Sequence, residues 1–149
     1  MSNLVQKIQD NLKGALKKGD QITLATLRML SSELKNAQIE KKAELRDEDV
    51  LKVIQKQVKS RQDSVEQFRA GGRDDLVGKE EAEIKILETY LPEQLSEDEV
   101  REIVKEAISK TNATGMGDMG KVMEVVMGQV SGRAQGGVVS GIVKEELQG

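Results

Sequence analysis

Apolar side chains recur with the period of an α-helix along almost the whole chain, and this periodicity is the feature that most limits its fold. Proline, which interrupts helices, occurs once, at Pro92. No segment alternates apolar and polar residues as a half-buried strand would. We therefore expect an all-α, multihelical protein.

Helix-start and helix-stop signals divide the periodic sequence into seven helices. Gly19 suits the left-handed position that follows a helix, so the first two helices should form a tight hairpin. Two short helices with apolar stripes are expected in the glycine-rich region 117–147. The other five helices are expected to start at N-cap residues, namely Ser2 or Asn3, Asp20, Asp47, Asp74 and Ser96.

The helices are expected to form two domains, because Pro92 forbids helix at Leu91 and stops the fourth helix. Residues 1–92 would form a larger N-terminal helical domain that contains the hairpin and two longer helices. Residues 93–149 would form a small C-terminal three-helix domain.

The chain has no cysteine and no histidine, which excludes several kinds of active site. It cannot form a disulfide, a Ser–His or Cys–His nucleophile pair, or a zinc site built on those ligands. We therefore expect no catalytic residue, no metal and no cofactor. No apolar run approaches the roughly 20 residues that cross a bilayer, and the charged N-terminus is unlike a secretory signal. These features favour a cytoplasmic protein with no membrane partner.

The sequence MGKVM, at residues 119–123, is the first candidate binding segment. Gly120 would leave the first turn of a helix bare, Lys121 would add a cation beside its N–H groups, and Asp118 would cap it, which suits a phosphate. In the structural alternative, the methionines and Val122 are core and Gly120 lets a neighbouring helix approach. Both interpretations of Gly120 and Lys121 stay open.

The sequence SGRAQGG, at residues 131–137, is the second candidate. Gly132 and Gly136 permit unusual backbone angles and close approach of a partner, and the Arg133 guanidinium could bind a phosphate with two hydrogen bonds. The alternative is a flexible turn in which Arg133 pairs with a local acid such as Glu145. These two interpretations are equally weighted.

The run of mixed charge at residues 60–76 is the third segment of interest. Its arginines, Arg61, Arg69 and Arg73, alternate with acidic residues. We expect most of these to form ion pairs three or four positions apart on a solvated helix face. One alternative is that Arg73, Asp74 and Asp75 form a bent joint between the third and fourth helices. A carboxylate metal site is another, although no EF-hand pattern is present.

Four segments together closely resemble the YqeY family, and the match covers essentially the whole chain. Its most specific part is YLPEQLS, MGKVM and GRA-x-G in that order. The family consists of small bacterial proteins that share a tail domain with the GatB subunit of the glutamine-dependent tRNA amidotransferase. The four segments are LRMLSSELKNAQIEK (27–41), SVEQFRAGGRDDL (64–76), EAEIKILETYLPEQLSEDEV (81–100) and DMGKVMEVVMGQVSGRAQGGVVSGIVKEEL (118–147).

The resemblance implies a fold of two helical parts and a role in RNA binding. In GatB the related tail domain contacts the elbow of the tRNA, while ammonia production and transfer occur on other domains. This chain therefore looks like a tRNA-binding accessory module linked to carbon–nitrogen ligase chemistry with glutamine as amide donor. By similarity, Gly120 and Lys121 match the family's MGKVM, and Gly132, Arg133 and Gly136 match its GRADG.

Gln135 departs from the family pattern, which usually has aspartate at this position. Aspartate would be a strong N-cap for the last helix, whereas glutamine is a poor one, which weakens that helix start by about 1 kcal/mol. The substitution also removes a negative charge near any bound phosphate.

Three functional hypotheses follow. The first is a module that recognises tRNA or another structured RNA by shape, since two aromatics in the whole chain do not make a single-strand platform. The second is an adaptor that binds an amidotransferase or another protein without contacting nucleic acid. The third, a free-standing amidotransferase, ranks lowest because the chain lacks the cysteine that glutaminase chemistry uses. Bulk electrostatics would direct a polyanion to residues 1–46, with nine basic and five acidic side chains.

Overall fold

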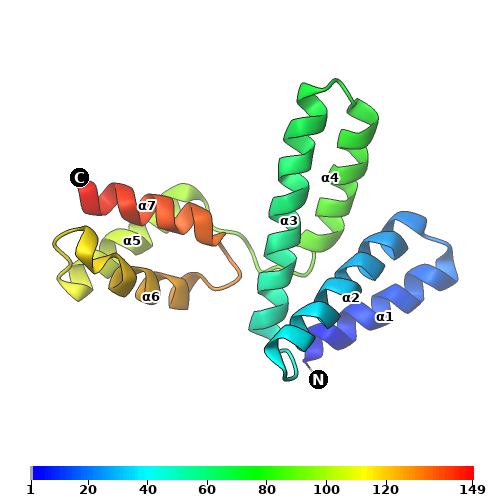
Figure 1. Ribbon diagram of the computed structural model, residues 1–149, viewed down its shortest axis with the longest axis horizontal. Helices are drawn as coiled ribbons and strands as arrows, with labels where there is room; N and C mark the ends of the chain where they lie inside the picture. The colour runs from blue at the N-terminus through cyan, green and yellow to red at the C-terminus, as the bar shows by residue number, and fades with distance from the viewer. Residues whose placement is uncertain (1) are drawn as a thin grey trace. The chain divides into compact units, whose positions relative to one another are not determined.

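The computed structural model describes residues 2–149 and is all-α, as the periodicity predicts (Figure 1). Within these residues there is no strand, and no helix is long and apolar enough to cross a bilayer. A short 3-10 turn, η1, covers Met116–Asp118. The helices are α1 (Asn3–Lys18), α2 (Gln21–Lys41), α3 (Asp47–Ala70), α4 (Asp74–Glu88), α5 (Glu97–Thr111), α6 (Met119–Val130) and α7 (Gly136–Gln148).

The hairpin of α1 and α2 forms as its capping residues predict. Ser2 Oγ accepts a hydrogen bond from the backbone N–H of Val5 at 2.9 Å, and Asp20 Oδ1 accepts one from that of Thr23 at 3.2 Å. Gly19 lies between the helices with φ +70°, a left-handed conformation that other residues adopt at a cost. The turn therefore depends on glycine at this position.

The expected N-caps of α3 and α4 are wrong by one residue. Asp47 and Asp74 are the first helical residues, and the N-cap positions are Arg46 and Arg73. At α3 the carboxylate of Asp49 accepts a hydrogen bond from the Arg46 N–H at 2.8 Å, so an acid in the first turn satisfies this group. The acids are still favourably placed, because the N-terminal end of a helix carries partial positive charge.

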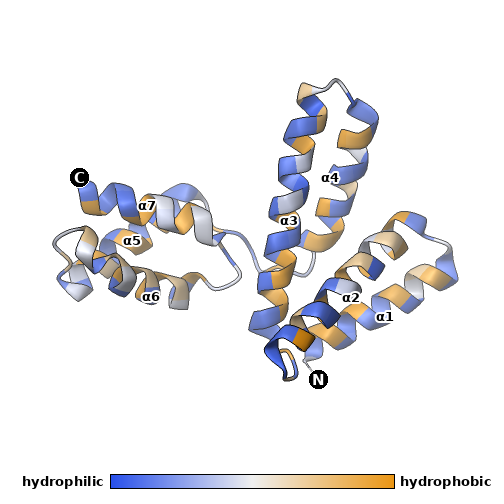
Figure 2. Ribbon diagram, viewed as in Figure 1, coloured by the Kyte–Doolittle hydropathy of each residue, from blue (hydrophilic) through white to orange (hydrophobic). Residues whose placement is uncertain are grey.

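The helices pack into two compact units, the first ending at Leu91 and the second beginning at Pro92. In the first unit, α1 to α4 turn their hydrophobic residues toward a shared aliphatic core (Figure 2). Tyr90, near the end of this unit, has a buried side chain, and its hydroxyl accepts a hydrogen bond from Asn11 Nδ2 at 2.7 Å. The largest fully buried side chains of this core are Ile8, Leu27, Leu30, Ile54, Leu87 and Val50.

The second unit has a separate core made mainly of valine. Arg101 links α5 to α7, because its guanidinium donates to Glu145 at 2.9 Å and to Glu146 at 2.8 Å. The fully buried side chains are those of Val100, Val104, Ala107, Val122, Val126, Val130, Val139 and Val143.

The charged run at residues 60–76 is mostly exposed, as expected, but its arginines do not form the expected ion pairs three or four positions apart. Arg61 is 11% exposed and forms ion pairs with Glu80 and Glu83 of α4. Arg69 also reaches across to α4, where it pairs with Glu81 at 3.0 Å. These contacts join α3 to α4. The carboxylate metal alternative finds no support, since no group of acidic side chains within residues 2–149 could hold a metal ion.

Candidate nucleic-acid interface

Helix α6 separates the candidate residues into two groups. Gly120 and Lys121 lie in its first turn, whereas Gly132, Arg133 and Gly136 follow its last residue. The 12 residues of α6 place its two ends about 18 Å apart. The candidates therefore form two separate positions on the second unit rather than one pocket.

The first position, at the start of α6, carries a negative charge as well as a positive one. Asp118 was expected to cap α6, but its carboxylate instead accepts a hydrogen bond from the Thr114 N–H at 3.0 Å. That hydrogen bond, and then the positive charge of Lys121, hold the pKa of Asp118 below its ordinary value. The carboxylate is thus ionised at neutral pH, and it offsets the charge of Lys121.

The close-packing explanation of Gly120 is wrong. A methyl group added there would meet no heavy atom of residues 2–149 within 4 Å, apart from its own stretch of backbone. The structural interpretation is correct for the neighbouring side chains, because Val122 is buried and Met119 and Met123 pack against the core. Gly120 therefore leaves exposed backbone that the unit's own packing does not require.

The second position is the connection between α6 and α7, which is held by the segment at residues 93–95. Gly132 is buried with φ +76°, and its carbonyl accepts a hydrogen bond from Gln94 Nε2 at 2.8 Å. The Leu95 N–H donates to the carbonyl of Arg133, also at 2.8 Å. The connection is therefore a fixed turn. Gly132 serves the turn, since a side chain would strain its left-handed backbone.

Arg133 lies on this fixed turn with most of its guanidinium available. Its Nε donates to the carbonyl of Glu93 at 3.4 Å, and Nη1 and Nη2 have no partner within residues 2–149. The alternative pairing with Glu145 does not form, because Glu145 binds Arg101 instead. Two N–H-bearing nitrogens thus remain for an anion.

The start of α7 is bare backbone. Gln135 has extended angles, and its side chain forms no cap hydrogen bond within the described chain, as expected of a poor N-cap. Gly136 and Gly137 are exposed, and a methyl group on either would meet no described heavy atom within 4 Å beyond its own backbone stretch. The first N–H groups of a helix have no acceptor inside it and favour anions. Arg133 and these N–H groups are therefore close neighbours in the chain.

Reasoning from the sequence missed the role of residues 93–95. It gave them no part in the candidate site, whereas they hold the candidate turn at Gly132 and Arg133. The Leu95 contact joins backbone groups, which every residue carries, so the sequence offers no signal for it.

Comparison with known proteins agrees with this motif set. The model of the Yqey-like protein family matches residues 5–147. A Pyrenophora tritici-repentis protein named altered inheritance of mitochondria protein 41, mitochondrial, is 35% identical over 147 residues, covering 97% of this chain and 79% of the relative. An uncharacterized protein of Schizosaccharomyces pombe is 37% identical over 94 residues, covering 63% and 76%.

A third relative aligns over a shorter region. It is the Vanderwaltozyma polyspora protein with the same name as the Pyrenophora relative, and it is 34% identical over 91 residues, or 60% of this chain and 49% of the relative. The family match spans nearly the whole chain and includes both candidate positions. The chain therefore belongs to the Yqey-like protein family.

Proposed function

We propose that the protein is an accessory module that binds a folded RNA such as tRNA through its second unit. The observation that carries this proposal is the turn at Arg133, where a largely free guanidinium precedes the uncapped, glycine-bare start of α7. Guanidinium groups and helix N-termini are both groups that bind phosphate. Lys121 and the exposed backbone at Gly120 would provide a second contact.

The recognition would be of shape and phosphate rather than of base stacking. The two aromatic side chains of the sequence belong to the first unit, where Tyr90 is buried and Phe68 packs against the core. Neither offers the aromatic platform on which single-stranded bases stack. A folded RNA with an ordered phosphate backbone fits the described residues better than a single strand.

The binding would be weak in isolation. The second unit has six basic and ten acidic residues, so bulk electrostatics oppose association with RNA. With Arg133 and Lys121 as the contacts, about two phosphates are neutralised. The logarithm of the affinity should then fall with the logarithm of the salt concentration with a slope of about −2.

By resemblance, the module would assist glutamine-dependent carbon–nitrogen ligation without catalysing it. We assign no catalytic residue to the chain. The sequence favours the cytoplasm, while two of the relatives carry the word mitochondrial in their own names. Both compartments contain tRNA, so the proposal requires only that the chain and a folded RNA share one.

A titration of the whole protein with folded tRNA at low salt tests the proposal. Polyuridine of equal length is the control, because it presents phosphates without a fold. We expect saturable binding of tRNA, weaker binding of polyuridine, and a shallow salt dependence. The absence of tRNA binding, or equal affinity for both RNAs, would contradict the proposal.

A further inference from the structure

A groove between α2 and α3 in the first unit has no role in the proposed RNA contact. Its volume is about 510 Å³, within the range of ligand sites. Met29 and Ala37 of α2 and Val53 of α3 give it an apolar surface. Met29 is 55% exposed although it is a large hydrophobic residue. An apolar surface between two helices is the kind of site that accepts a third helix.

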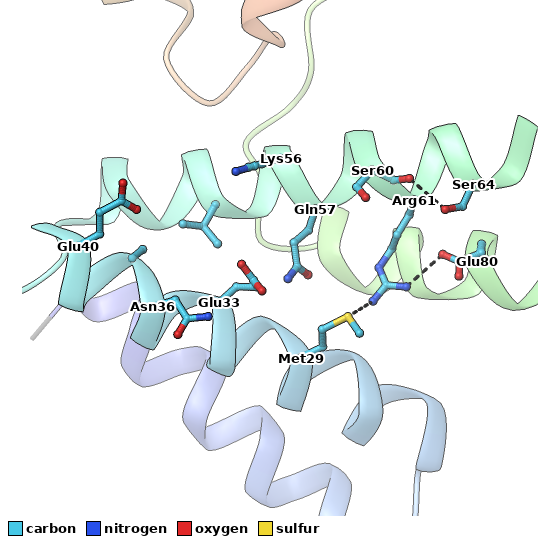
Figure 3. A pocket seen from close by; sticks show the side chains of 12 residues that line it. Met29, Glu33, Asn36, Glu40, Lys56, Gln57, Ser60, Arg61, Ser64 and Glu80 are labelled. Carbon is cyan, nitrogen blue, oxygen red and sulfur yellow. Dashed lines mark hydrogen bonds and ion pairs between the residues drawn. The ribbon is translucent and has the colours of Figure 1, made fainter.

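The groove contains a buried acceptor that lacks a donor. Gln57 Oε1 is buried and has no hydrogen-bond partner within residues 2–149. Figure 3 shows Gln57 of α3 and Glu33 of α2 pointing toward one another across the groove. A buried acceptor without a donor destabilises a fold, so a ligand that donates here would recover a lost hydrogen bond.

The charges around this acceptor favour a positively charged donor. Glu33 and Glu40 are exposed and have no ion-pair partner among the described residues. Arg61, at one end of the groove, is already neutralised by Glu80 and Glu83, and it donates to the sulfur of Met29 at 3.1 Å. The remaining cation of the lining is Lys56, which extends away from Gln57 (Figure 3).

We propose that this groove binds an amphipathic helix of a partner protein through one lysine or arginine side chain. The basic group would donate to Gln57 Oε1 and pair with Glu33, while the apolar face of the helix would cover Met29, Ala37 and Val53. An RNA is disfavoured by the carboxylates of the groove. The surface lies on the first unit, so the inference is independent of the proposed RNA contact.

Two peptides that differ at one position test this inference. Each is an amphipathic helix of about 15 alanine, leucine and glutamine residues. One carries a central arginine and the other citrulline, its neutral analogue. The methyl resonance of Met29 in the whole protein reports binding. We expect the arginine peptide to bind about tenfold more tightly, the effect of one charge-assisted hydrogen bond.

Variants identify the groove as the source of this preference. Gln57→Leu and Glu33→Gln should abolish the difference between the peptides, while tRNA binding stays unchanged. Gln57→Leu should also raise the midpoint of thermal unfolding, because it removes the unpaired acceptor, so a misfolded variant would be recognised. The control is Glu88→Gln, which removes an exposed carboxylate elsewhere in the unit and should preserve the preference.

Three outcomes would overturn the inference. One is equal affinity of the arginine and citrulline peptides, or no binding of either. Another is displacement of the arginine peptide by tRNA, which would assign the surface to RNA. The third is self-association of the protein that Gln57→Leu abolishes, which would make a second copy of the chain the occupant.

Discussion

The backbone N–H of Leu95 donates to the carbonyl oxygen of Arg133 at 2.8 Å, so the segment after Pro92 holds the turn between α6 and α7. Gln94 adds a second link, because its Nε2 donates to the carbonyl of the buried Gly132. The guanidinium of Arg133 is therefore presented from a fixed backbone. A contact prepared in this way loses less conformational entropy when it binds a partner.

Replacing Gln94 with alanine should loosen this turn. The carbonyl of Gly132 would lose its side-chain donor, which we expect to lower the free energy of unfolding by about 1 kcal/mol. Urea denaturation measures this change, and amide hydrogen exchange at Arg133 and Ala134 should accelerate. Unchanged exchange in this variant would show that Gln94 does not hold the turn.

Gln135→Asp should separate stability from RNA binding. Aspartate at the N-cap of α7 should stabilise the fold by about 1 kcal/mol, because it can accept hydrogen bonds from the helix start. It would also place a negative charge beside the proposed phosphate position and weaken tRNA binding. The control is Gln135→Asn, which is an equally good cap without the charge and should stabilise without weakening binding. Thermal melts of both variants measure the stabilisation, and parallel tRNA titrations measure whether only Gln135→Asp weakens binding.

Glu83→Ala should be among the most destabilising single changes in the first unit. Glu83 is 6% exposed and pairs with Arg61, so its removal would leave a buried guanidinium with Glu80 alone. Breaking a buried ion pair costs about 3 kcal/mol, which urea denaturation would detect.

The exposed pair Arg69–Glu81 is the matched control, since it also joins α3 to α4. Its side chains are 62% and 51% exposed, and Arg69→Ala should change stability by less than about 1 kcal/mol. A similar loss of stability in Glu83→Ala and Arg69→Ala would contradict the expectation that the buried ion pair contributes more than the exposed one.

These two pairs show where prediction from the sequence reached its limit. The helices were predictable because the signals that set them, such as the caps at Asp20 and Ser96 and the left-handed Gly19, are local. The partners of Arg61 were not, because acids at helical spacing on α3 compete with acids that only the packing of α4 brings near.

Some features of the candidate site could likewise be predicted from local sequence, whereas others depend on the packing. The glycines and the poor cap at Gln135 were readable from local backbone requirements. The available guanidinium of Arg133 was not predictable from the sequence. It depends on Glu145 pairing with Arg101 and on Glu93 lying beside the turn, and both contacts arise only from the fold.

Asp118 should make the second unit sensitive to acid. The hydrogen bond from the Thr114 N–H, together with the charge of Lys121, lowers the pKa of Asp118 below 3.8 in the folded state. A carboxyl group with a depressed folded pKa stabilises the fold above its unfolded pKa, and this contribution is lost as the pH falls through the folded pKa.

Thermal melts of wild type and Asp118→Asn between about pH 5 and pH 2 measure this contribution. Asparagine can accept the same hydrogen bond without titrating. The difference in melting temperature between the two proteins should therefore shrink as the pH falls below 3.8. A difference that is constant with pH would show that the Asp118 charge does not stabilise the fold.

The most direct test of the RNA proposal is a low-salt titration of folded tRNA with Arg133→Ala and, in parallel, Lys105→Ala. Both changes remove one positive charge from the second unit, but Lys105 is exposed on α5 and is no part of the proposed contact. Arg133→Ala should keep its fold, because the Leu95 hydrogen bond uses the backbone of residue 133. We predict about a tenfold loss of affinity for Arg133→Ala and little change for Lys105→Ala. Equal affinities of the two variants would contradict the account.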